Sequence, residues 1–489
     1  MMRLNLIALI VTVSLGTMTA SFAQSSGSVR LPDTEAGRRV GEYIKAFNTG
    51  EEAIRAFIAS NVSKEGLERR SLDERLNIYR EMRSNMESIT PRRIIETSES
   101  RITILFETKR GDWFEIGFLF EPQSPHYLQG LRVEDAEPPD ASPTKTDGKT
   151  STAPMTQSEL VSAVENYLDE LARNDKFSGV VLLTDANRKV IFQKSYGFAN
   201  KTYNAPNRID TKFNLGSINK TFTKVAIGQL MEQGKLALTD TIGKHLPDYP
   251  NRQAAEKVTI EQLLDMTSGI GDFFGEKFAA TPKDRIRKIN DYFQFFASEP
   301  LQFEPGTNRR YSNGGYVVLG AIIEKVSGQS YYDYVREHIT RLAGMTSTDY
   351  FELDQLPPNT ATGYTLRAGS ANGERRANIY TLPARGSSAG GGYSTAEDLL
   401  KFIAALESNK LLKAETMLQM FPGLAKWKGA GNRSQDGGFG VAGGSPGVNA
   451  EIDIEFGNGY AYIVLSNYDP PIAETVGKQI RALLARVKN

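Results

Sequence analysis

The sequence predicts a two-unit protein of the α/β (α+β) class, whose larger unit is a mainly antiparallel sheet flanked by helices. Three observations support this prediction. The 489 residues exceed the length at which one hydrophobic core usually stops growing. A polar stretch without apolar periodicity divides the chain at residues 137–155. Strand-like runs lie near both ends of the part that follows, with helical sequence between them, so its first and last strands are expected to meet in one sheet.

Residues 1–23 are predicted to be a secretory signal peptide. An arginine precedes a mostly apolar run from Leu4 to Leu15, and Ser21 and Ala23 occupy the −3 and −1 positions of a cleavage site. The apolar run is shorter than the roughly 20 residues of a membrane-spanning helix, so no stable membrane anchor is expected after cleavage. The mature chain would begin near Gln24 and lie outside the cytoplasm.

Residues 24–136 predict a small α+β unit. Helical periodicity in residues 34–47 and a capping box at Ser71 and Glu74 indicate helices in its first half. Three strand-like runs follow, at residues 101–110, 112–121 and 127–135. The pattern is similar to cystatin-like or nuclear-transport-factor-like folds. We expect this unit to mediate contacts with other proteins or dimerisation.

Residues 137–155 predict a flexible linker, because they are polar and rich in proline, serine and threonine. The second unit, residues 156–489, begins with a helix whose first turn carries a capping box at Thr156 and Glu159. A last amphipathic helix closes the chain. The strand-like runs of this unit are residues 177–184, 189–199, 448–456 and 460–469.

The composition excludes several classes of function. The 58 lysine and arginine residues balance 58 aspartate and glutamate residues, so no net field is available to attract nucleic acid. Cysteine is absent, which removes disulfides, thiolate metal sites and a cysteine nucleophile. The three histidines lie far apart in the sequence, which leaves a Ser-His-Asp mechanism little to draw on. We expect neither metal nor cofactor, and a base other than imidazole.

The segment NLGSINKTFT places Ser217 at a helix start and Lys220 three residues later, on the same face. Lysine can remove the serine proton only if burial or a neighbouring cation lowers its pKa from about 10.4 towards neutrality. The partial positive charge of a helix N-terminus favours an oxyanion at Ser217 and disfavours the protonated amine. The alternative is that Ser217 only caps the helix and Lys220 is solvated.

Tyr311 and Asn313 precede an almost wholly apolar helix that ends at Gly328. A helix that is apolar on all sides is buried, so a phenol and an amide would lie at the edge of the core. The phenol could relay a proton and the amide could hydrogen-bond a polar substrate. The alternative is that Tyr311 only contributes to packing.

A glycine-rich segment containing Gly443, Gly444 and Gly447 leads into a strand. Glycines let a ligand or another backbone approach closely, and an edge strand offers free amide groups. Such amides would complete an oxyanion hole with the backbone N–H of Ser217. The alternative is a bulge and a turn at the start of the strand.

Taken in order, SINK at residues 217–220, YSN at residues 311–313 and the glycine-rich strand start resemble the three motifs of the serine β-lactamase and penicillin-binding-protein superfamily, especially its class C and esterase branches. Connecting segments such as VTIEQLLDMTSGI and SSAGGGYSTAEDLLKF are similar too. The resemblance covers residues 156–489. It implies a β-lactamase/transpeptidase-like fold with an all-helical subdomain beside the sheet, and a bacterial periplasmic or secreted protein.

The resemblance also implies catalytic roles. Ser217 would be the acylated nucleophile, Lys220 its activating partner, and Tyr311 the group that exchanges protons with nucleophile, leaving group and water. The expected protein is an exported serine hydrolase acting on an ester or amide bond of a small-molecule or peptide substrate. Two alternatives stay open: a catalytically impaired binding protein for a cell-wall peptide or a protein partner, and a D-aminopeptidase or transpeptidase.

Substrate-binding positions follow from the same resemblance. Asn313 would orient the acyl chain, and Gly443 and Gly444 would line the substrate site. The backbone N–H groups of Ser217 and Gly444 would hold the tetrahedral oxyanion.

The sequence departs from the family pattern at Val441, where the third motif normally starts with lysine or histidine. Losing a charge-assisted hydrogen bond to a substrate carboxylate costs about 1.5 to 3 kcal/mol, or roughly ten- to a hundredfold in affinity. An uncharged ester or amide is therefore expected rather than strong β-lactamase activity. Arg433 or Lys428, from the preceding loop, are alternative sources of the cation.

Overall fold

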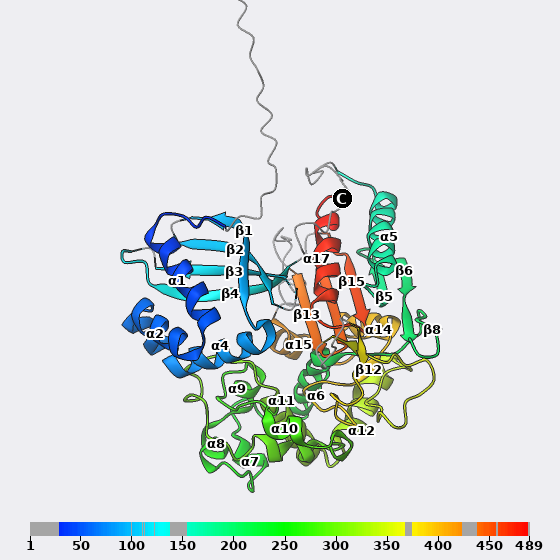
Figure 1. Ribbon diagram of the computed structural model, residues 1–489. Coiled ribbons are helices and arrows are strands. Elements are labelled where there is room, and N and C mark those ends of the chain that lie inside the picture. The colour runs from blue at the N-terminus through cyan, green and yellow to red at the C-terminus, as the bar shows by residue number, and fades with distance from the viewer. Residues whose placement is uncertain are drawn as a thin grey trace, which may run out of the picture. The chain divides into compact units, whose positions relative to one another are not determined.

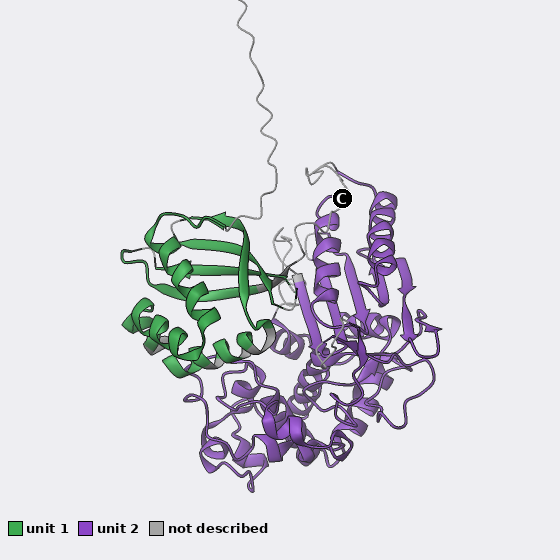
Figure 2. Cartoon of the chain, in the orientation of Figure 1, with its two compact units in different colours: residues 1–150 green, residues 151–489 purple. Residues whose placement is uncertain are grey.

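The structure is a computed structural model, shown in Figure 1. The chain divides into two compact units, residues 1–150 and 151–489 (Figure 2). The predicted signal peptide, most of the predicted linker, Lys428 and Arg433 lie outside the described residues. Described are residues 29–98, 100–109, 111, 113–121, 123–136, 154–366, 374–422, 438–455 and 458–487.

Unit 1 packs four helices against a four-stranded antiparallel sheet with strand order β1-β2-β3-β4. Its core contains the buried aromatic rings of Phe47, Phe106 and Phe118. The capping box of Ser71 and Glu74 forms as predicted. The elements are α1 (Glu35–Thr49), α2 (Glu51–Asn61), α3 (Lys64–Arg69), α4 (Leu72–Met86), β1 (Ile89–Thr97), β2 (Arg101–Thr108), β3 (Trp113–Phe120) and β4 (Leu128–Ala136).

Strand β1 was not predicted from the sequence. It contains Pro91, followed by two arginines, and most of its residues are exposed or half-buried. Its pairing with β2 shifts register twice. Proline is tolerated in a sheet at an edge strand or a bulge, and β1 is at the edge, so tertiary pairing overrides a weak local pattern.

Unit 2 is built on a five-stranded sheet of order β13-β14-β15-β5-β6, and all of its neighbouring strands are antiparallel. The pairing of β5 with β15 joins the two ends of the unit, which confirms the predicted sheet. The strands are β5 (Gly179–Thr184), β6 (Val190–Tyr196), β13 (Gly438–Ser445), β14 (Val448–Glu455) and β15 (Ala461–Ser466).

Both faces of this sheet are buried. Helices α5 (Gln157–Arg173) and α17 (Ile472–Leu484) cover one face, where Val181 and Val464 are fully buried. The opposite face packs against the central helices, including α6 (Lys220–Glu232) and α14 (Ala396–Glu407). Figure 1 shows α17 and α5 alongside the strands, and α6 below them in the view.

A largely helical region lies between β6 and β13 and carries the first two motifs. Its helices are η1 (Gly216–Asn219), α6, α7 (Ile242–His245), α8 (Arg252–Lys257), α9 (Ile260–Leu264), α10 (Glu276–Ala280), η2 (Lys283–Arg285), η3 (Ile289–Phe295), α11 (Asn313–Ser327), α12 (Tyr331–Val335), η4 (Arg336–Thr340), α13 (Arg341–Ala343), α14 and α15 (Ala414–Met420). Its short strands are β7 (Phe198–Asn200), β8 (Ala205–Pro206), β9 (Phe213–Asn214), β10 (Tyr364–Thr365), β11 (Arg376–Ala377) and β12 (Tyr393–Ser394). Among the described residues, no helix is both long enough and apolar enough to cross a bilayer.

Candidate active site

Ser217 lies in η1, a single 3₁₀ turn that leads directly into α6, whose first residue is Lys220. Side chains at positions i and i+3 eclipse in a 3₁₀ turn, so the amine stands over the hydroxyl. Lys220 Nζ lies 3.0 Å from Ser217 Oγ. Neither η1 nor α6 is capped by a side chain, so capping is not the role of Ser217.

Tyr311 reaches the same hydroxyl from the segment before α11. The Tyr311 hydroxyl and Ser217 Oγ are 2.6 Å apart. Ser312 is extended and caps α11 by accepting a hydrogen bond from the N–H of Gly315. Because neighbouring side chains of an extended segment alternate in direction, Ser312 turns into the cap while Tyr311 and Asn313 share the opposite side. Tyr311 is 52% exposed, which argues against a packing role.

Lys220 is the buried centre of the site, with 6% of its surface exposed. Besides Ser217, its amine contacts Asn313 Oδ1 at 2.7 Å and the Ala389 carbonyl at 2.5 Å. An ammonium would donate to all three oxygens. A neutral amine would donate to the amide and the carbonyl, and its lone pair would be free to accept the Ser217 proton.

Burial lowers the pKa of Lys220 to about 7, against the opposing effect of the Asp272 carboxylate. The rings of Tyr311 and Tyr316 lie 4.8 and 5.4 Å from its Nζ and favour the charged form. A substantial fraction of neutral amine is therefore present near pH 7. Burial of the hydroxyl end raises the pKa of Tyr311, and its hydrogen bond with Ser217 lowers it less, so the phenol stays protonated.

Asp272 is a site residue that the sequence analysis missed. Its Oδ2 accepts hydrogen bonds from the backbone N–H of Asn313 at 3.1 Å and from Asn313 Nδ2 at 2.8 Å. This contact turns Asn313 Oδ1 towards Lys220 and leaves one amide N–H of Asn313 for a substrate. The sequence feature that could have identified Asp272 is its position as a single charged residue in the apolar, glycine-containing stretch IGDFF.

Strand β13 is the edge of the sheet, and its glycines press against η1. A Cβ atom on Gly443 would lie 2.1 Å from the Leu215 carbonyl oxygen and 2.7 Å from the Ser217 nitrogen. A Cβ atom on Gly216 would lie 2.8 Å from the Gly444 nitrogen. The two backbones that carry the predicted oxyanion N–H groups, those of Ser217 and Gly444, therefore face each other. Pairing with β14 shows no register shift, which excludes a bulge.

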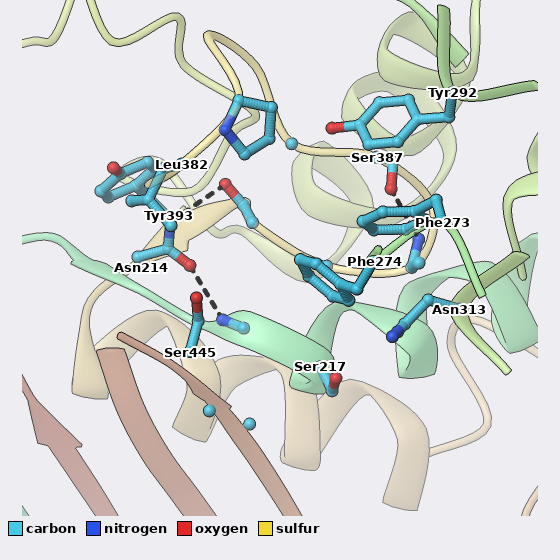
Figure 3. Close-up of a pocket in the computed structure, with 18 of the residues that line it drawn as sticks. Asn214, Ser217, Phe273, Phe274, Tyr292, Asn313, Leu382, Ser387, Tyr393 and Ser445 are labelled. Carbon is cyan, nitrogen blue, oxygen red and sulfur yellow. Dashed lines mark hydrogen bonds between the residues drawn. The ribbon is translucent and has the colours of Figure 1, made fainter. Parts of the chain in front are cut away.

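A cavity of about 330 Å³ opens beside Ser217. Asn313, Gly443 and Gly444 line it, together with a largely apolar wall of Phe273, Phe274, Tyr292, Phe351, Leu353 and Leu382. Figure 3 shows Phe273 and Tyr292 on one side of the pocket and Leu382 and Tyr393 on the other. We call it the aromatic cavity. All six predicted site residues, Ser217, Lys220, Tyr311, Asn313, Gly443 and Gly444, are thus gathered around one hydroxyl.

Comparison with known proteins gives a family. The beta-lactamase family model matches residues 164–486. PbpX of Bacillus subtilis (strain 168) is 32% identical over 289 residues, which are 58% of this chain and 68% of PbpX. Penicillin-binding protein 4* of the same strain is 35% identical over 187 residues, 38% of this chain and 40% of that protein.

Solved structures share the fold. A penicillin-binding protein from Bacillus halodurans superposes with a TM-score of 0.57 and 32% identity, covering 65% of this chain and 99% of its own. The D-amino acid amidase of Ochrobactrum anthropi gives a TM-score of 0.56 at 23% identity over 67% of this chain and 98% of its own, which shows the fold alone. These matches confirm the superfamily resemblance and the β-lactamase/transpeptidase-like fold. The chain therefore belongs to the beta-lactamase family.

Proposed function

We propose that unit 2 is a serine hydrolase that cleaves an ester or amide through an acyl-Ser217 intermediate. One observation carries the proposal: Ser217 Oγ lies within hydrogen-bond distance of both the buried amine of Lys220 and the hydroxyl of Tyr311. At a pH near the pKa of Lys220, part of the amine is neutral and can accept a proton. A serine hydroxyl held between that amine and a protonated phenol therefore has both a proton acceptor and a proton donor.

In acylation, neutral Lys220 takes the hydroxyl proton while Ser217 Oγ attacks the carbonyl carbon. The N–H groups of Ser217 and Gly444 would bind the resulting oxyanion. Tyr311 then donates its proton to the leaving group as the bond to the carbonyl carbon breaks. This step leaves an acyl-serine, a protonated Lys220 and a Tyr311 phenolate, whose charge the nearby ammonium stabilises.

Deacylation reverses the proton flow. The Tyr311 phenolate takes a proton from water as the water oxygen attacks the acyl carbon. The bond between that carbon and Ser217 Oγ breaks, and Lys220 returns its proton to Oγ. Both groups regain their starting states. The aromatic cavity supports an apolar acyl group, with Asn313 offering its remaining N–H to a polar atom of that group.

The direct test is covalent labelling. The protein is incubated with a fluorophosphonate or an activated neutral ester, and intact mass is measured. A single adduct is expected in the wild type and none in Ser217→Ala. Ser408→Ala, at an exposed serine on the surface, is the control and should label normally. Absence of any wild-type adduct would favour the catalytically impaired binding protein instead.

A second candidate, an amidase or D-aminopeptidase for substrates with a free amine, is favoured by Glu474. It is the charged residue among the described lining of the aromatic cavity, and its Oε2 is buried without a hydrogen-bond partner. A substrate ammonium would supply that partner. Glu474→Gln should then lower kcat/KM for a D-amino acid p-nitroanilide at least about tenfold and leave the N-acetylated substrate unchanged. Equal effects on both substrates would exclude this candidate.

We also propose export and a contact role for unit 1. Cleavage before Gln24 should give a mature chain in the periplasmic or secreted fraction, identified by its intact mass. Light scattering of that mature chain tests dimerisation. A monomer mass at all concentrations would exclude dimerisation and leave contacts with other proteins as the role of unit 1.

A further inference from the structure

The peptide unit that joins Gly443 to Gly444 is held on both faces of β13. A Cβ atom on Gly443 would lie 2.7 Å from the Ser217 nitrogen. On the opposite face of the strand, a Cβ atom on Gly444 would lie 2.6 Å from Pro470 Cγ. The N–H of this peptide unit, which belongs to Gly444, is the second oxyanion donor of the proposed mechanism. A change in the orientation of the peptide would therefore turn this donor away from the oxyanion.

Asn449 lies opposite Gly444 in the neighbouring strand β14 and contacts the same peptide unit. Its side chain is fully buried, and its Nδ2 donates a hydrogen bond to the Gly443 carbonyl oxygen at 3.2 Å. Because this peptide unit is trans and planar, the C=O of Gly443 and the N–H of Gly444 point in opposite directions within one plane. The hydrogen bond that holds the carbonyl therefore also sets the direction of the oxyanion donor.

The other end of the Asn449 amide holds the start of α17. Ala473, in the first turn of α17, donates its backbone N–H to Asn449 Oδ1 at 2.6 Å. Pro471, the residue before the helix, makes no side-chain cap, so Asn449 satisfies one of the N–H groups that a helix start leaves unpaired. Because a backbone N–H can only donate, this contact identifies the oxygen end of the amide and makes the other end the donor to Gly443.

The hydrogen bond from Asn449 also acts on the strength of the donor. Donation to a peptide carbonyl polarises the peptide unit and makes its N–H a stronger donor, because hydrogen bonds in a chain reinforce one another. Asn449 is not among the described residues that line the aromatic cavity, so it acts on a substrate through this peptide. The alternative is that Asn449 only ties α17 to the sheet, and its loss would then cost stability without a specific loss of rate.

We propose that Asn449 is a positioning residue for the oxyanion hole, because its amide holds the peptide unit whose N–H is the Gly444 donor. This inference rests on the proposed function, in which the N–H groups of Ser217 and Gly444 bind the tetrahedral oxyanion. Charge on that oxygen develops in the transition state, so a correctly aimed donor speeds acylation more than it strengthens substrate binding. Loss of Asn449 should therefore lower the acylation rate constant and leave the affinity for the substrate nearly unchanged.

The first test removes both hydrogen bonds of Asn449. Asn449→Leu keeps a side chain of similar size and should slow acylation of Ser217 by a neutral p-nitrophenyl ester about ten- to a hundredfold, since outright loss of an oxyanion donor costs about 10² to 10³. Rapid mixing at several ester concentrations separates the acylation rate constant from the dissociation constant of the ester, which should stay within about twofold. Affinity for a trifluoromethyl ketone, which forms an oxyanion when Ser217 adds to it, should fall by the same factor as the rate constant.

Asn207→Leu is the matched control. Asn207 is a buried asparagine of the same unit, and its Nδ2 donates to Ser178 Oγ and to the Tyr196 carbonyl. The described lining of the aromatic cavity does not include it. Its replacement should lower the thermal unfolding temperature, as Asn449→Leu does, and leave the acylation rate constant of the folded protein within about twofold of wild type.

Asn449→Asp separates the two hydrogen bonds. One oxygen of the new carboxyl can still accept the Ala473 N–H. The other oxygen faces the Gly443 carbonyl, to which it donates when it is protonated and which it repels when the carboxyl is ionised. The acylation rate constant of this variant, divided by that of wild type at the same pH, should therefore fall as pH rises and the carboxyl loses its proton. The ratio removes the titration of Lys220, Glu451 and the other groups that both proteins share.

Failure of this inference and failure of the proposed function give different results. If Asn449→Leu acylates as fast as wild type, if its loss appears in the dissociation constant instead, or if Asn207→Leu is slowed equally, the positioning role is overturned and the hydrolase stands. If Asn449→Leu does not fold, Asn449→Asp decides, and a ratio independent of pH overturns the role. If no ester acylates Ser217 in the wild type, the hydrolase itself fails, and the inference fails with it.

Discussion

Lys220 Nζ donates a 2.7 Å hydrogen bond to Asn313 Oδ1, although the two residues are 93 positions apart in the chain. This bond joins α6 to α11 directly behind the nucleophile. It also connects the amine, through the Asn313 amide, to the Asp272 carboxylate. The charge state of Lys220 therefore depends on contacts from separate segments of the chain.

Activity should fall on the acid side as Lys220 becomes protonated. The pKa of Lys220 is lowered to about 7, and the amine must be neutral to accept the serine proton. Below that pH, log kcat/KM for a neutral ester should fall with a slope approaching one per pH unit. Lys220→Ala should lose about 10² to 10⁴ in acylation rate. A flat wild-type profile from pH 5 to 8 would contradict this role.

Asp272→Asn should shift that acid limb to lower pH. The Asp272 carboxylate raises the pKa of Lys220 against the effect of burial, so removing its charge favours the neutral amine. The amide oxygen of the new side chain can still accept a hydrogen bond from Asn313, which separates charge from geometry. The measurement is the pH profile of kcat/KM. Asp284→Asn, at an exposed carboxylate of the same unit, should leave the profile in place.

Gly443→Ala should damage the oxyanion site. Its Cβ atom would lie 2.1 Å from the Leu215 carbonyl oxygen, so β13 and η1 must separate. Loss of an oxyanion donor costs about 10² to 10³ in kcat, with a smaller effect on KM. Gly275→Ala is the control, because a Cβ there meets nothing within 4 Å. Similar losses in both variants would point to general destabilisation.

Stability should fall between pH 4.5 and 7 because of Glu451. Burial raises the pKa of this carboxyl from 4.5 to about 7, and Arg481 opposes the shift. A raised native pKa means that the native state binds the proton more tightly than the unfolded state. The stabilisation is complete below pH 4.5 and lost as pH rises through 7.

Glu451→Gln should remove that pH dependence. The difference in unfolding free energy between wild type and variant, from denaturant titrations at several pH values, should change by roughly 2 to 3 kcal/mol across the window. The variant should gain relative to the wild type as pH rises. A constant difference from pH 4 to 8 would show that Glu451 does not titrate in this range.

Part of the fold could be predicted from short patterns of consecutive residues in the sequence. The capping boxes at Ser71 and Thr156 form as predicted, because a cap depends on four consecutive residues. The antiparallel sheet of unit 2 was also predicted, because its buried strands are apolar runs that can be recognised in the sequence. Strand β1 was missed because its residues resemble a loop until β2 pairs with them.

The chain by itself determined the spacing of the three motifs. One turn separates Ser217 from Lys220, and Tyr311 and Asn313 are two positions apart, so helix and strand geometry set which side chains share a face. Only the tertiary structure decided what surrounds them. Asp272 meets Asn313, and β13 meets η1, because segments that are distant in the sequence pack together. Coulomb energies depend on separation in space and on burial rather than on position in the sequence.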